Sequence, residues 1–251
     1  MMTRMLTLGY GVICYLIFFG AFLYLMGFLS NMWVPKGIDS GVAPETGVAI
    51  AINLGLIALF GVQHSVMARP WFKDRWTRLV PQPVERSTYV LATSIVLILL
   101  YVLWQPMPQV IWDLSATPLA IIAWAVFLLG FTIVLLSTFM TDHFDLFGLR
   151  QVFLRFTEKP YTYPPFKIVL FYKFVRHPLY FGMVIAFFAT PTMTWGHLLF
   201  AVCMTGYILM ALPWEEKDLV EALGDDYRAY QQSVPRLMPG MGGSQSSDAS
   251  G

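Results

Sequence analysis

Long uncharged apolar runs constrain this chain most strongly, because only a lipid bilayer accommodates several of them in one protein. Four such runs cover residues 6–29, 47–67, 89–104 and 118–140. A helix of about 20 apolar residues crosses a hydrocarbon core about 30 Å thick. Charged residues make up only 12% of the chain, whereas soluble domains contain about 25%. The sequence therefore predicts an all-α, polytopic membrane helix bundle.

A fifth apolar region, residues 179–212, is too long for one straight crossing. As a single helix it would extend about 50 Å at about 1.5 Å per residue. Pro191 and Gly196 interrupt it, and the three threonines at positions 190, 192 and 194 can satisfy backbone groups freed by the break. We therefore expect four long spans followed by a C-terminal helical hairpin of two rather short helices.

Basic residues predict how the chain is oriented in the membrane. Nearly all of them fall at the N-terminus, after the second run, after the fourth run and beyond the hairpin, and only Lys36 falls in the intervening loops. Short cytoplasmic loops retain Lys and Arg, so both termini are expected in the cytoplasm, in an inner bacterial membrane. The net charge of +1 gives no reason to expect a nucleic acid partner.

Two polar motifs flank the predicted hairpin. Arg176 and His177 precede Pro178, which suits the first turn of a helix whose free amide groups favour an anion. A carboxylate could bind there, or Arg176 could simply mark the membrane boundary. At the other end, Glu215 and Glu216 follow the apolar region. Such a pair suits a cationic or hydroxyl-rich ligand, or could form the exposed, acidic start of a cytosolic helix.

Together these motifs carry a resemblance to known enzymes. RHPLYFG at 176–182, PWEEKDL at 213–219 and LGDDYRAYQQSVPR at 223–236 resemble the superfamily of isoprenylcysteine carboxyl methyltransferases and phospholipid methyltransferases. The likeness covers residues 171–239, and in that superfamily the segment encloses S-adenosylmethionine. It implies that the residues lining or supporting the cofactor pocket are Arg176, His177, Pro178, Tyr180, Gly182, Glu215, Glu216, Tyr227 and Tyr230, with Arg236 a further candidate.

Two further segments narrow the resemblance. FGVQHSVMARP at 60–70 and TDHFDLFGLR at 141–150 resemble the bacterial, NnrU-like branch that contains the methanethiol S-methyltransferases. His64 ends the second span and Asp142 and His143 follow the fourth, so all three should reach one membrane boundary. A thiol needs to lose its proton before it attacks a methyl group. His64 or His143, oriented by Asp142 or Asp145, could accept that proton; alternatively, the histidines only hydrogen-bond helix ends.

The resemblance implies methyl transfer from S-adenosylmethionine to a small, membrane-permeable thiol, such as methanethiol, with dimethyl sulfide as product. The expected organisation is a four-span membrane region (1–140), a cytoplasmic segment with the hairpin and the cofactor-binding core (141–239), and a disordered tail (240–251). A lipid, isoprenoid or carboxylate acceptor is the main alternative. A metal or haem site built from the histidines is a weaker one, because no metal-ligand spacing is present and no metal is expected. The oligomeric state stays open.

Overall fold

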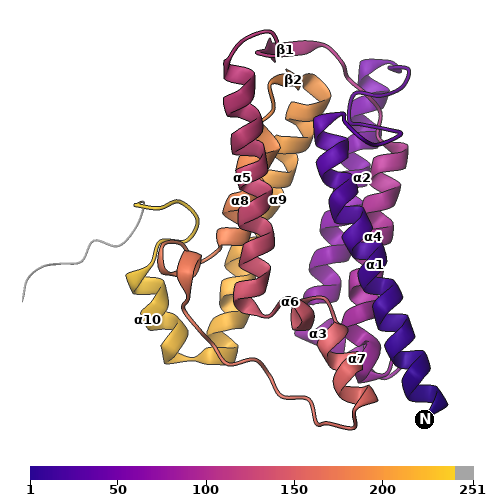
Figure 1. Ribbon diagram of the computed structural model, residues 1–251, viewed down its shortest axis with the longest axis vertical. Coiled ribbons are helices and arrows are strands. Elements are labelled where there is room, and N and C mark those ends of the chain that lie inside the picture. Colours follow the sequence, from indigo (N-terminus) through magenta and orange to yellow (C-terminus); the bar gives the residue numbers. More distant parts are fainter. Residues whose placement is uncertain (241–251) are drawn as a thin grey trace, which may run out of the picture.

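A computed structural model describes residues 1–240 and confirms the predicted helical membrane architecture (Figure 1). In these residues the helices long and apolar enough to cross a bilayer are α1 (Met2–Ser30), α2 (Thr46–Ala68), α4 (Gln82–Leu103), α5 (Leu119–Thr141) and α9 (Trp195–Leu223). The shorter elements are α3 (Pro70–Trp76), β1 (Val110–Asp113), α6 (His143–Leu146), α7 (Leu149–Phe156), the 3-10 helix η1 (Leu170–Lys173), α8 (Pro178–Phe188), β2 (Thr192–Thr194) and α10 (Asp225–Ser233). Residues 241–251 of the predicted disordered tail lie outside the described residues.

The fifth apolar region folds back on itself as predicted, but its two arms are unequal. α8 has 11 residues and α9 has 29. Between them, β2 pairs antiparallel with β1, and the Thr194 hydroxyl caps α9 by accepting a hydrogen bond from the His197 amide. α9 continues through Pro213, because a membrane helix tolerates proline where neighbouring groups satisfy the freed backbone. The second arm is therefore longer than predicted, and Glu215 and Glu216 belong to its last turns.

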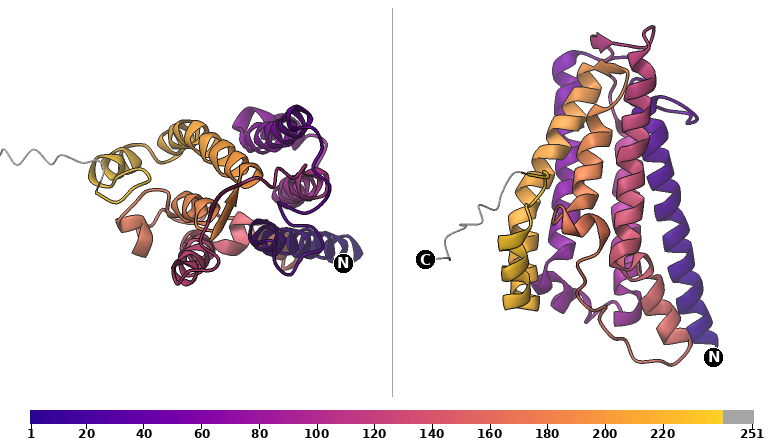
Figure 2. Two further views of the ribbon diagram at one scale, coloured as in Figure 1. Left: turned by 90° about the horizontal axis from the view of Figure 1, so that it is seen from above. Right: turned by 60° about the vertical axis from the view of Figure 1, so that its left-hand side comes forward.

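The long helices and α8 form two groups of three. α1, α2 and α4 lie side by side in one group, and α5, α8 and α9 form the other (Figures 1 and 2). The backbones of α5 and α8 touch where Gly130 faces Gly182: a Cβ atom on Gly182 would lie 2.6 Å from the Gly130 carbonyl oxygen. Small residues allow such close approach between membrane helices. This contact fixes α8, and with it the residues at its start.

An aromatic cluster joins the two groups near the strands. Phe28 of α1 packs on Tyr101 of α4, with ring centroids 5.1 Å apart. Trp104 reaches across to Phe200 of α9 at 5.8 Å, and Phe200 contacts Phe187 of α8 at 5.3 Å. All five side chains are buried. The bundle is thus tightly packed at this end, and any opening between the two groups has to lie towards the other end.

The segments rich in basic residues gather at that other end. The N-terminus, α3, α6, α7 and α10 all lie at the end opposite β1 and β2 (Figures 1 and 2). The sequence placed these same segments on one face of the membrane, and the structure brings them together. Polar residues that could take part in chemistry are therefore concentrated at this end.

Candidate active site

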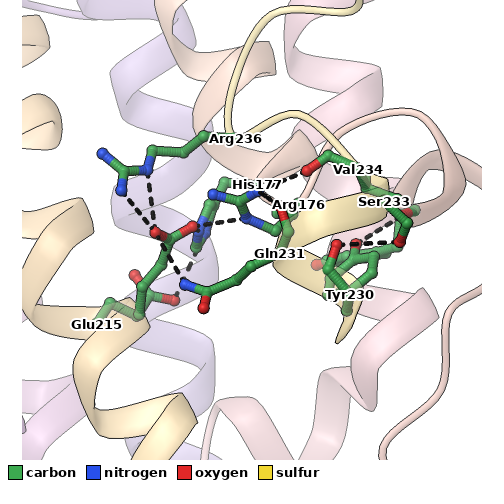
Figure 3. Close-up of polar contacts among 10 residues, drawn as sticks. Arg176, His177, Glu215, Tyr230, Gln231, Ser233, Val234 and Arg236 are labelled. Atoms are coloured by element: carbon green, nitrogen blue, oxygen red, sulfur yellow. Dashed lines mark hydrogen bonds and ion pairs between the residues drawn. The ribbon is translucent and has the colours of Figure 1, made fainter. Parts of the chain in front are cut away.

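A buried carboxylate holds the start of α8 against α9 and the C-terminal segment. Glu216 of α9 is only 3% exposed. Its Oε1 atom accepts a hydrogen bond from Arg176 Nε at 2.7 Å, and its Oε2 atom lies 2.8 Å from Arg236 Nη2. His177 Nε2 lies 3.2 Å from Oε1. Arg176 and Arg236 approach from different sides (Figure 3), so the buried charge is compensated by opposite charges, as burial requires.

Arg176 is also bound to the backbone of the C-terminal segment. Its Nη1 atom donates to the carbonyl oxygens of Gln231 and Val234. The backbone amides of Arg176 and His177 donate in turn to the carbonyls of Pro235 and Arg236, at 2.9 and 3.1 Å. The guanidinium of Arg176 is therefore engaged inside the protein. A cofactor carboxylate, which the sequence suggested for this position, would have to compete with these contacts.

A cavity of about 430 Å³ lies between the two groups of helices. Its walls come from both groups, and along α9 they extend from Phe200 to Asp218, about 27 Å at the rise of an α-helix. The end near Phe200 is apolar, with Phe22 and Leu25 of α1 beside it. The end at α3 carries charges of both signs, from Arg69, Lys73, Arg86, Glu215 and Asp218. The cavity therefore changes from apolar to charged along the bundle axis.

A group of hydroxyls surrounds His64 in the wall of this cavity. The Tyr89 hydroxyl lies 3.0 Å from both ring nitrogens of His64, and Thr93 Oγ1 lies 3.4 Å from Nδ1. Next to it, the hydroxyls of Ser65 and Tyr207 are hydrogen-bonded at 3.0 Å. Since these residues come from α2, α4 and α9, the cluster spans both groups of helices. His64 thus lies where the apolar and charged parts of the cavity meet.

His143 also lines the cavity, but its ring is more fully engaged. Nε2 lies 2.8 Å from the Tyr15 hydroxyl, and Nδ1 lies 2.8 Å from Thr138 Oγ1. Burial lowers the pKa of His143. The structure pairs both predicted histidines with hydroxyls and not with the aspartates expected to orient them. Asp142 has a φ of 107° and turns its carboxylate onto the amide of Asp145, capping α6.

The residues predicted to bind the cofactor divide between the cavity and its supporting wall. Tyr180 and Glu215 line the cavity, and the Tyr180 hydroxyl donates to Glu215 Oε2 at 2.7 Å. Pro178 begins α8 and Gly182 packs on α5. Tyr227 and Tyr230 pack α10 against α9 and against Phe166, with ring centroids 6.0 and 5.7 Å from that ring. Arg176, His177 and Glu216 form the buried ion cluster described above.

Comparison with known proteins places this architecture in a family. The chain is 53% identical to methanethiol S-methyltransferase of Mycobacterium tuberculosis over 238 residues, which cover 95% of this chain and 98% of that protein. It is 50% identical to methanethiol S-methyltransferase 1 of Bradyrhizobium diazoefficiens, over 92% of this chain and 81% of that protein. The enzyme of the same name from Crocosphaera subtropica is 48% identical, over 96% and 94%. No protein-family model and no solved structure matches the chain.

The chain belongs to the methanethiol S-methyltransferase family. The similarity extends over nearly the whole chain, so both groups of helices are shared with these relatives. This confirms the resemblance that the sequence motifs suggested. The protein is a methyltransferase embedded in a membrane.

Several residues that line the cavity of this methanethiol S-methyltransferase family member belong to no sequence motif. Lys73 and Arg86 line its charged end, and Tyr89 and Tyr207 surround His64. In the sequence, the basic residues indicate only the orientation of the chain, and the two tyrosines lie within apolar runs. No local spacing marks them, because α2, α3, α4 and α9 bring them together only in the folded bundle.

Proposed function

We propose that this protein transfers a methyl group from S-adenosylmethionine to methanethiol, giving dimethyl sulfide and S-adenosylhomocysteine. The observation that carries the proposal is the cavity between the helix groups, apolar at one end and charged with both signs at the other. The names of the relatives, which are 48–53% identical, support methanethiol as the acceptor. The apolar end suits a small uncharged thiol, and the charged end suits a polar methyl donor.

The cavity fits S-adenosylmethionine in size and in charge. Its volume of about 430 Å³ lies within the range of about 300–1,000 Å³ that is usual for small-molecule sites. The donor carries a carboxylate, an ammonium and a sulfonium, and the cavity offers cations, carboxylates and the aromatic faces of Tyr89 and Tyr180. When bound, S-adenosylmethionine supplies a methyl group on a sulfonium sulfur that keeps the electron pair of the broken carbon–sulfur bond.

We assign His64 as the group that accepts the thiol proton. A neutral imidazole accepts a proton at the ring nitrogen that is not donating a hydrogen bond. The Tyr89 hydroxyl, 3.0 Å away, can hold the ring in place. The two nitrogens of His64 share the single Tyr89 hydroxyl, which can bond to only one of them at a time. Each nitrogen of His143 has its own hydroxyl at 2.8 Å, so His143 is less available for this role. His143 instead links α6 to α1 and α5 through these hydrogen bonds. Asp142 caps the start of α6.

The orientation in the membrane follows the charge distribution. We propose that the end carrying the N-terminus, α3 and α10 faces the cytoplasm of a bacterial inner membrane, in agreement with the retention of basic residues on that side. S-adenosylmethionine would then reach the charged end from the cytosol. The bilayer would deliver the thiol, because small apolar molecules partition into hydrocarbon.

The acceptor can be tested with purified protein in nanodiscs. The protein receives methyl-labelled S-adenosylmethionine together with methanethiol, a carboxylate-bearing isoprenoid thioether or a bacterial lipid extract, and labelled dimethyl sulfide is separated from labelled lipid. We expect the label in dimethyl sulfide only. Label in lipid or isoprenoid, with none in dimethyl sulfide, would overturn the assignment of the acceptor. Heat-treated protein provides the background value.

A further inference from the structure

Three cations from different elements converge on the charged end of the cavity. Arg69 follows α2, Lys73 lies on α3 and Arg86 lies in the first turns of α4. Arg69 is paired with Asp218 of α9, with Nη1 2.9 Å from Oδ2. This ion pair joins the two groups of helices and uses the charge of Arg69. Lys73 and Arg86 are the two other cations at this end of the cavity.

Arg86 is held in place by uncharged groups, and Lys73 lies near it at the same end of the cavity. Arg86 donates from Nε to the Leu146 carbonyl at 2.7 Å, and its guanidinium lies over the Tyr89 ring, 4.9 Å from the centroid. In residues 1–240, the ion pairs of 4.0 Å or less include neither Lys73 nor Arg86. Burial, together with the nearby charge of Arg86, lowers the pKa of Lys73, and the carboxylates of Glu85 and Asp218 offset only part of this shift. Two partly buried like charges repel each other, so an anion between them would be stabilised.

The other wall of the cavity presents a carboxylate. Glu215 of α9 has a side chain that is 39% exposed, and its Oε2 atom accepts the hydrogen bond of Tyr180. Its Oε1 atom lies 3.9 Å from His177 Nδ1, and within residues 1–240 no cation lies closer to it. Lys73 of α3, Arg86 of α4 and the Glu215 carboxylate of α9 therefore border the same space.

This pairing of charges matches an amino-acid zwitterion. We propose that Lys73 and Arg86 bind the carboxylate at the amino-acid end of the methyl donor, and that Glu215 faces its ammonium. The inference rests on the proposed function and names the residues that hold this end of the ligand. Arg176, the residue that the sequence suggested for the carboxylate, is instead engaged by Glu216 and two backbone carbonyls.

The assignment has a consequence for the assembly of the site. Arg86 lies on α4 of the first helix group and Lys73 on α3, which contacts α2 of that group, whereas Tyr180 and Glu215 belong to the second group. The methyl donor would thus connect both groups of helices. The C-terminal motifs of the protein alone would not be sufficient to bind it. S-adenosylhomocysteine keeps the same amino-acid end and should bind through the same contacts.

Isothermal titration calorimetry on the purified full-length protein tests this inference. S-adenosylhomocysteine is compared with 5′-methylthioadenosine, which lacks the amino-acid end. Hydrogen bonds to charged groups contribute about 1.5–3 kcal/mol, so Lys73→Gln should raise the Kd of S-adenosylhomocysteine about tenfold or more. The Kd of methylthioadenosine should stay within about twofold, because that ligand never made the contact. Arg86→Lys should weaken S-adenosylhomocysteine less than Arg86→Gln.

Arg78→Gln is the matched control, since Arg78 is an exposed cation just after α3 and outside the cavity lining. It removes the same charge and should leave both affinities unchanged. Equal weakening of both ligands by Lys73→Gln, or unchanged binding of S-adenosylhomocysteine, would overturn the carboxylate assignment. If the wild-type protein bound neither ligand, the proposed function itself would fail, and the two failures are thereby distinguished.

Discussion

The two adjacent glutamates near the end of α9 should lose different properties on the same substitution. Glu216 is enclosed by Arg176, His177 and Arg236, whereas Glu215 faces the cavity with 39% of its side chain exposed. Changing each to glutamine removes one charge and keeps the shape. Glu216→Gln should mainly reduce stability, and Glu215→Gln should mainly reduce affinity for the methyl donor.

The size of the first effect follows from the burial of its partners. Removing one member of a buried ion pair costs about 3–5 kcal/mol. The side chain of Arg176 is 8% exposed and stays buried without its partner, whereas that of Arg236 is 48% exposed and can be rehydrated. We therefore expect the lower limit, about 3 kcal/mol for Glu216→Gln. For a chain of this size, that loss lowers Tm by about 6–12 °C.

Thermal unfolding in detergent, followed by circular dichroism, measures this difference. Glu215→Gln serves as the control, because an amide oxygen still accepts the hydrogen bond of Tyr180 and the loss of stability should stay below about 1 kcal/mol. Calorimetry with S-adenosylhomocysteine gives the second readout. A wild-type Tm for Glu216→Gln, or an equal fall for both variants, would refute the view that Glu216 holds the wall and Glu215 serves the ligand.

Three other predictions concern the helix contact and the histidines. Gly182→Ala should lower the free energy of unfolding by about 1–3 kcal/mol, because its Cβ atom would lie 2.6 Å from the Gly130 carbonyl oxygen; Gly206→Ala, which meets nothing within 4 Å, should have no such cost in the same melting experiment. His64→Gln should slow methyl transfer by about 10²–10⁴-fold while calorimetry shows an unchanged Kd for S-adenosylhomocysteine; a normal rate would remove His64 from the mechanism. Burial lowers the folded-state pKa of His143 below its ordinary value of about 6.5, so the stability it provides is present above that pH and is lost as the pH falls towards the lowered value. Wild-type Tm should therefore fall more than that of His143→Gln between about pH 7.5 and about pH 5.5, and parallel curves would contradict this.

The membrane architecture could be predicted because it depends on properties that are local in the sequence. The length of an uncharged run determines whether a helix can cross, and the apolar region 179–212 had to fold back because it was too long to cross once. The turn was found through Pro191 and the threonines beside it. The length of α9 could not be predicted, since the apolar region stops at residue 212 whereas the helix continues through Pro213 to Leu223.

The motifs indicated some residues that the fold brings together, and their role in binding the cofactor stays a prediction. His177, Tyr180, Glu215 and Glu216 lie close together as the resemblance implied. The sequence could not distinguish the buried Glu216 from the cavity-lining Glu215, because the two are adjacent and chemically identical, and only the direction of each side chain from α9 separates them. Lys73 and Arg86 also gave no signal, since their convergence depends on how α3 and α4 pack.

The shortness of α8 affects where the reaction takes place relative to the lipid. Its 11 residues extend only about 17 Å at the rise of an α-helix, roughly half the thickness of a hydrocarbon core. α8 starts at the ion cluster and ends near the strands, so it covers only part of the length of α9, which has 29 residues. In the proposed reaction, a thiol dissolved among acyl chains would meet the methyl donor within the helix bundle without crossing the full interface, and the thioether would leave by the same route.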